Sequence, residues 1–170
     1  MVVLAPTREL ALQIAAEADE LVRFSDLRTV AVYGGAPLRA QADRLRKGVD
    51  VVIATPGRLL DHIERRNLRL DHVEILVLDE ADRMLDMGFL PDIDAIIRRM
   101  PAERQTLLFS ATMPQTILGL SRRYLTDPVR VEIATARPPD TIRQELYPVP
   151  KHLKAGLLLD LLRAEGVDSA

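Results

Sequence analysis

The sequence predicts an α/β fold built on a doubly wound parallel sheet. Short apolar segments alternate along the chain with longer segments in which apolar residues recur at helical spacing. The apolar run within Val73–Asp82 is short and rich in Val, Ile and Leu, as expected of a strand whose two faces are both covered. With 170 residues, the chain is about one domain long and can bury a substantial core.

The first part of the chain is predicted to form three strands, each followed by a helix. Thr7 stands at the N-cap of the first helix, and Glu9 lies in its first turn, where a negative charge suits the helix dipole. Thr55 followed by Pro56 marks the start of the third helix. We expect strands over Val2–Ala5, Thr29–Tyr33 and Val51–Ala54, and a second helix over Pro37–Arg46.

The second part continues the alternation as far as a segment without periodicity. After the strand within Val73–Asp82 we expect strands over Gln105–Phe109 and Val129–Ile133, with helices over Arg83–Met87, Phe89–Arg99 and Pro114–Tyr124. Pro138-Pro139 then indicates a linker. We therefore predict a first domain over residues 1–135, a linker over 136–141 and the start of a second domain over 142–170, with an extended segment over Ile142–Val149 and a helix over Lys151–Glu165.

Composition excludes several classes of site. The net charge of −2 gives no sign of bulk attraction to nucleic acid, so any such binding must be local. The absence of cysteine excludes disulfides, cysteine-based zinc sites and thiol nucleophiles. No segment resembles a signal peptide or a membrane span, so we expect a cytoplasmic protein without a membrane partner. His62, His72 and His152 show no ligand spacing and are interpreted as surface or packing residues.

Five predicted strands end in polar or glycine-rich clusters. Because the carboxyl ends of parallel strands meet at one edge of a sheet, we expect these clusters to form a ligand site. Carboxylates collected there could hold hydrated Mg²⁺ and orient a water molecule, although a solvated acidic turn is an alternative. The clusters are Pro6-Thr7-Arg8, Gly34-Gly35, Thr55-Pro56-Gly57-Arg58, Asp79-Glu80-Ala81-Asp82 and Ser110-Ala111-Thr112.

The first and third clusters each lie where a helix begins. Arg58 stands near the positive end of its predicted helix, so an anion would be attracted by both its guanidinium group and the free N–H groups. Thr7 has an alternative role as a simple helix cap, and the Gly34-Gly35 pair an alternative role as a turn.

In identity and order, the five motifs resemble those of the first RecA-like domain of DEAD-box ATP-dependent RNA helicases of the bacterial type. The resemblance implies a P-loop NTPase-type fold and ATP and Mg²⁺ as cofactors. Asp79 would hold Mg²⁺ through water, Glu80 would orient or deprotonate the attacking water, and Asp82 would pair with Ser110 and Thr112 to couple nucleotide state to domain closure.

The resemblance also implies a partner, a single RNA strand bound by its backbone with little sequence specificity. No protein partner is indicated. The RNA groove would be lined by Pro6, Thr7, Arg8, Gly34, Gly35, Thr55, Pro56, Gly57 and Arg58.

The sequence departs from the family pattern in one respect. None of its eight glycines is followed by lysine, so the P-loop that the family places upstream of Pro6-Thr7-Arg8 is missing. We therefore expect an internal helicase fragment that lacks its N-terminal P-loop segment and does not hydrolyse ATP alone. The alternatives are a non-catalytic RNA- or protein-binding module, a DNA helicase of a related superfamily 2 family, or a P-loop-independent Mg²⁺ hydrolase that uses Asp79, Glu80 and Asp82.

Overall fold

A computed structural model describes residues 1–132 and 145–164 of the protein. Met1–Val129 forms one compact unit. In the second unit, Arg130–Ala170, the described helical residues form the short 3₁₀ turn η1 (Lys151–Leu153) and helix α7 (Lys154–Ala164). The predicted linker over 136–141 lies outside the described residues, and the predicted domain boundaries stay predictions. Within the described ranges, no helix is long and apolar enough to cross a bilayer.

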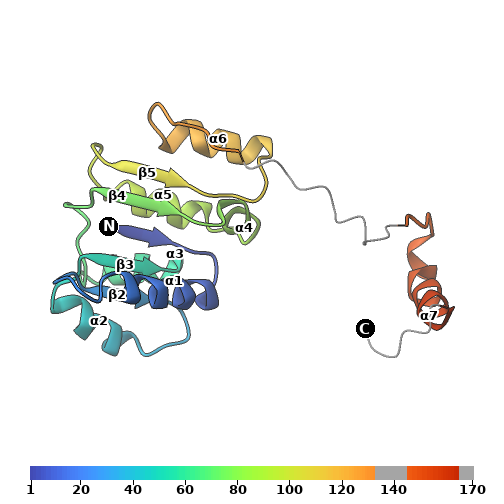
Figure 1. Ribbon diagram of the computed structural model, residues 1–170, viewed down its shortest axis with the longest axis horizontal. Helices are drawn as coiled ribbons and strands as arrows, with labels where there is room; N and C mark the ends of the chain where they lie inside the picture. The colour runs from blue at the N-terminus through green and yellow to red at the C-terminus, as the bar shows by residue number, and fades with distance from the viewer. Residues whose placement is uncertain (133–144, 165–170) are drawn as a thin grey trace. The chain divides into compact units, whose positions relative to one another are not determined.

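The compact unit is built on a five-stranded sheet in the order β2-β3-β1-β4-β5 (Figure 1). Every neighbouring pair is parallel; in β1, for example, Val2 pairs with Val52 on one side and with Leu76 on the other. The predicted parallel α/β fold is therefore confirmed. The strands are β1 (Val2–Leu4), β2 (Thr29–Val32), β3 (Val51–Ala54), β4 (Ile75–Leu78) and β5 (Gln105–Leu108).

The direction of each connection between strands determines which face its helix covers. The connection from β1 to β2 runs one way across the sheet, and those that follow run the opposite way. Because such crossovers are right-handed, α1 covers one face and the later crossover helices cover the other. The helices are α1 (Arg8–Leu21), α2 (Leu38–Arg46), α3 (Pro56–Glu64), α4 (Ala81–Asp86), α5 (Leu90–Ile97) and α6 (Gln115–Tyr124).

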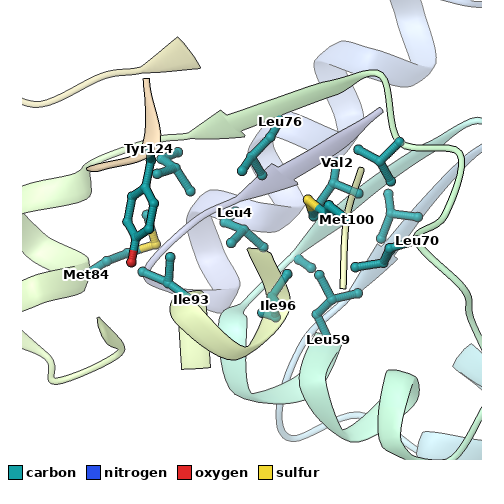
Figure 2. Close-up of a cluster of buried hydrophobic side chains, with 14 of the residues drawn as sticks. Val2, Leu4, Leu59, Leu70, Leu76, Met84, Ile93, Ile96, Met100 and Tyr124 are labelled. Carbon is teal, nitrogen blue, oxygen red and sulfur yellow. The ribbon is translucent and has the colours of Figure 1, made fainter. Parts of the chain in front are cut away.

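Alternate residues of each strand enter two separate cores. Val3 of β1 joins the smaller core under α1, together with Ala11 and Ala15. Leu4, the next residue of β1, joins the larger core on the opposite face, which Figure 2 shows with side chains from β1, β4, α3, α4 and α5. This period of two explains why β1, β3 and β4 are apolar at every position.

One predicted strand, over Val129–Ile133, is wrong for the residues that the structure describes. Residues 129–132 have no regular structure, and the side chains of Val129 and Val131 are 90% and 84% exposed. A strand needs a neighbour to accept its hydrogen bonds, and none of the described strands pairs with this segment. Alternating valines alone therefore do not make a strand here.

Candidate functional site

All five sequence motifs lie at the carboxyl edge of the sheet, each where one strand ends. The strand order divides the motifs into two neighbouring groups. Arginines and glycines follow β2, β3 and β1, whereas the acidic motif and the Ser-Ala-Thr motif follow β4 and β5. The connections that leave the neighbouring strands β1 and β4 run in opposite directions across the sheet. In open α/β sheets, ligands bind between two such strands.

Asp79 is the first residue after β4 and lies beside β1. Its backbone N–H donates to the carbonyl oxygen of Leu4 at 2.9 Å, which extends the β1–β4 ladder by one residue. Its carboxylate accepts a hydrogen bond from the N–H of Glu80 at 2.9 Å. Asp79 also lines an apolar pocket of about 330 Å³ with Val3, Val77 and Phe109 among its walls. Burial there raises the pKa of Asp79. The hydrogen bond from the N–H of Glu80 lowers this pKa in part, and the negative charge of Glu80 raises it further.

The raised pKa means that the negative charge of Asp79 is poorly compensated by its surroundings. None of the ion pairs among the described residues includes Asp79, so a bound cation would relieve this cost. No group of three or more potential ligands in residues 1–132 and 145–164 could hold a metal by itself. Mg²⁺ commonly takes only one or two carboxylates and completes its shell with water and phosphate. Asp79 therefore fits the water-mediated contact that the motif implies.

Glu80 adopts a backbone conformation that is uncommon for a residue with a side chain. Its φ of 48° and ψ of 52° lie in the left-handed region, at the N-cap of α4. Such a conformation costs of order 1–3 kcal/mol and persists where the surroundings enforce it. The two residues that flank Glu80 are fixed by backbone hydrogen bonds, which hold Glu80 in this conformation. The N–H of Asp79 donates to the carbonyl oxygen of Leu4, and the N–H of Ala81 donates to that of Phe109 at 3.0 Å. The Glu80 carboxylate accepts a hydrogen bond from Arg83 Nη1 at 3.2 Å.

Asp82 connects the motif after β4 to the motif after β5. Its Oδ2 accepts from the N–H of Thr112 at 2.9 Å and from the Thr112 hydroxyl at 2.6 Å. The Thr112 hydroxyl is the main cause that lowers the pKa of Asp82, and Ser110 contributes least. The Ser110 hydroxyl itself donates to the carbonyl oxygen of Thr112 at 2.7 Å. The predicted group is thus brought together, with Thr112 as the direct partner of Asp82.

Thr7 and Arg8 lie at the start of α1, next to the turn after β2. Thr7 Oγ1 accepts from the N–H of Leu10 at 3.2 Å, so this hydroxyl does cap the helix. The Arg8 guanidinium lies over the ring of Tyr33, 5.0 Å from its centroid. Gly35 has φ +78°, and a Cβ there would stand 3.5 Å from Arg8 Nη1. The positive φ therefore favours glycine in this turn, whereas a Cβ would make only ordinary contact with Arg8. Pro6 is buried, whereas Gly34 is exposed.

The motif after β3 forms the N-terminus of α3. Thr55 is the N-cap, but its side chain makes no capping hydrogen bond, and buried Pro56 occupies the first turn. Gly57 is exposed, and a Cβ at this position would lie 3.4 Å from Asp92 Oδ2 on α5. Arg58 is half-buried, and its Nη1 donates to Ala36 O at 2.8 Å and to Gln41 Oε1 at 3.1 Å.

Sequence reasoning missed three residues that contact the predicted arginines directly or through one neighbour. Tyr33 supports Arg8, Gln41 accepts from Arg58, and His62 contacts Gln41. The interpretation of His62 as a packing residue holds, since it is fully buried, while His72 and His152 are exposed. One signal could have found Gln41 and His62, because both are polar residues on the apolar stripe of an amphipathic helix.

Comparison with known proteins points to the family that the sequence motifs resemble. The family model described as DEAD/DEAH box helicase matches residues 1–119. The DEAD-box ATP-dependent RNA helicase CshA of Geobacillus kaustophilus is 43% identical over 169 residues, which cover 99% of this chain and 36% of that protein. The ATP-dependent RNA helicase CshA of Listeria monocytogenes is 53% identical over 131 residues, which cover 77% of this chain and 25% of that protein.

Solved structures agree with the curated relatives. The crystal structure of a DEAD box protein from the hyperthermophile Methanococcus jannaschii superposes with a TM-score of 0.70 at 44% identity, over 74% of this chain and 34% of that chain. This chain thus spans between 25% and 36% of the length of the three proteins named. On the family match, the identities and the shared fold, the chain belongs to the DEAD/DEAH box helicase family.

Proposed function

We propose that this chain supplies the water-activating and RNA-contacting edge of an ATP-dependent RNA helicase. The observation that carries the proposal is the gathering of all five motifs at one sheet edge, with carboxylates after β4 next to arginines and glycines after β1, β2 and β3. The relatives named ATP-dependent RNA helicases support the choice of ATP and RNA. We also propose a cytoplasmic site of action, which the lack of cysteine in these 170 residues supports.

On the nucleotide side, the chain's residues would position a water molecule and a cation. Bound Mg²⁺ would supply charge neutralisation at the phosphates. Asp79 would orient the waters of that ion, and Glu80, held in one backbone conformation by its neighbours, would take the proton of the attacking water. The left-handed backbone of Glu80 supports a functional role for this residue, because strained residues cluster at active sites, ligand clamps and switch regions.

On the RNA side, the proposal predicts the effect of Arg58→Ala. The hydrogen bonds of Arg58 to Ala36 and Gln41 both use Nη1, so its other N–H groups suit a phosphate. Loss of one charge-assisted contact should weaken binding of every single-stranded sequence roughly tenfold and reduce the salt slope by about one. Fluorescence anisotropy with labelled oligouridine and oligoadenosine in a salt titration measures both quantities.

Arg69→Ala is the matched control for Arg58→Ala. Arg69 has a side chain that is 85% exposed, and it precedes β4, on the opposite edge of the sheet from the motifs. Its loss should leave the salt slope unchanged. A base-specific loss with Arg58→Ala, or equal losses for the two variants, would contradict an RNA groove at the start of α3.

The Asp82–Thr112 contact predicts a separation of two activities. In a chimera in which these 170 residues replace the matching segment of Geobacillus kaustophilus CshA, Ser110→Ala with Thr112→Ala should reduce RNA unwinding more than ATP hydrolysis. The reason is that the Thr112 hydroxyl donates to Asp82 and the Ser110 hydroxyl to the backbone carbonyl of Thr112, so neither bonds to Asp79 or Glu80. Thr116→Ala, on the exposed side of α6, is the control. Equal loss of both activities would remove the coupling role.

A further inference from the structure

The polar side chains behind Arg58 form a buried chain of hydrogen bonds. His62 is fully buried and Gln41 is 6% exposed. His62 Nε2 lies 3.1 Å from Gln41 Oε1, and His62 Nδ1 lies 3.2 Å from Asn67 Nδ2. Buried polar groups are costly unless each one is paired. The donors and acceptors of this group must therefore fit one another.

Only one assignment of protons satisfies every contact. Gln41 Nε2 donates to Tyr33 O at 3.1 Å, so its Oε1 is the acceptor that faces His62. His62 then donates from Nε2, and its Nδ1 accepts from Asn67 Nδ2. Asn67 Oδ1 in turn accepts from Arg46 Nη2 at 3.0 Å, which fixes the orientation of that amide. His62 is therefore the neutral tautomer with its proton on Nε2.

Arg58 is attached to this group from the side of the motif edge. Its Nη1 donates to Gln41 Oε1 and to Ala36 O in the turn after β2. Gln41 thus receives hydrogen bonds from both Arg58 and His62 while it donates to Tyr33 in the same turn. One half-buried arginine is thereby held by two elements, the β2–α2 turn and α2.

We propose that Gln41 and His62 are positioning residues that hold Arg58 at the motif edge with Nη1 turned into the protein and its other N–H groups presented to an RNA phosphate. The inference rests on the proposed function, in which Arg58 contacts the RNA backbone. It adds a pre-organised support, which lowers the ordering cost of binding. It also makes RNA binding sensitive to the protonation of a group that never touches RNA.

Protonation of His62 would place a second N–H, on Nδ1, against the N–H₂ group of Asn67. The charged groups around His62 are Arg58 and Asp61 on its own helix, Arg65 at the C-cap of that helix, and the Arg46–Asp43 pair of α2 beyond Asn67. Burial is the main cause that lowers the pKa of His62, and the Arg58 charge is the second. Unfolded chains therefore bind this proton more readily, so folding stability from this site falls as pH drops below about 6.5.

The test is a double-mutant cycle in the 170-residue chain, read by anisotropy with labelled oligouridine. Gln41→Met keeps the length of the side chain and removes its hydrogen bonds. It should weaken RNA binding roughly two- to tenfold when Arg58 is present, and have no further effect with Arg58→Ala. Gln13→Met, an exposed glutamine on α1, is the matched control and should change nothing.

The outcomes distinguish a failure of the positioning role from a failure of the proposed RNA contact of Arg58. Equal losses in both Arg58 backgrounds, or no loss in either, would overturn the positioning role. If Arg58→Ala itself left RNA binding unchanged, the proposed RNA contact would be the part that fails.

His62→Gln keeps one donor and one acceptor without a titratable ring. It should bind RNA like the unmodified chain at pH 7.5 and, unlike that chain, show no additional loss toward pH 5.5; matching pH profiles would overturn the role of His62.

Discussion

Replacing Glu80 with glutamine should lower the rate of ATP hydrolysis by roughly two to four powers of ten, the usual worth of a positioned base. Glutamine keeps the length of the side chain but cannot take a proton. The backbone hydrogen bonds that hold residue 80 in the left-handed region come from Asp79 and Ala81, so they do not depend on the carboxylate. Single-turnover hydrolysis in the CshA chimera measures the effect.

Asp79→Asn provides the contrast within the same motif. It removes a negative charge next to the proposed Mg²⁺ position, so it should weaken binding of the Mg²⁺-nucleotide, whereas Glu80→Gln should leave that affinity nearly unchanged. Because the pKa of Asp79 is raised, the fold does not favour its charge, and Asp79→Asn should not lower the free energy of unfolding. Normal hydrolysis by Glu80→Gln, or nucleotide loss in that variant alone, would reverse the two roles.

Truncation of Leu4 to alanine should destabilise the chain by about 2–5 kcal/mol. Leu4 is fully buried in β1, the central strand, and its side chain enters the larger core with Leu59, Ile93 and Ile96 (Figure 2). Alanine would leave a cavity in this core, because β1 is held between β3 and β4 and the surrounding side chains cannot easily move to fill it. Urea denaturation followed by circular dichroism measures the change in the midpoint and in the free energy of unfolding.

Leu21→Ala is the control for Leu4→Ala, because it makes the same chemical change at the exposed end of α1. Leu21 is 85% exposed, so its truncation should change the free energy of unfolding by less than about 0.5 kcal/mol. Similar midpoints for the two variants would show that β1 does not lie at the centre of the folded sheet.

The fold was predictable where local pattern and tertiary environment agree. Five of the six predicted strands of the first domain form, because apolar runs such as Val51–Ala54 fit strands buried on both faces. The start of α1 was predictable from Thr7, whose cap depends only on residues three positions apart. The segment after α6 was not, since Val129 and Val131 have the right alternation, but a strand also needs a partner that local sequence does not specify.

The site was predictable as a set of motifs and not as a set of contacts. The rule that ligands gather at the carboxyl ends of parallel strands grouped Arg58 with Asp79, but it gave no information on strand order. The contact between Arg58 and Gln41 depends on how α2 and α3 pack together, and that packing is set by the whole sheet. For the same reason, sequence alone could not pair Arg8 with Tyr33.

The central place of β1 also determines when the sheet can be completed. Val2 pairs with Val52 of β3 and with Leu76 of β4, both far along the chain. Of the five strands that the structure describes, β1 leaves the ribosome first, yet both of its edges lack their partners in this sheet until β3 and then β4 have left the exit tunnel. Such non-local pairing makes folding slow, because long loops must close before the contacts form. The strand that leads into the first motif is therefore made before the other four strands and enclosed late, and during that interval its apolar faces need protection from other chains.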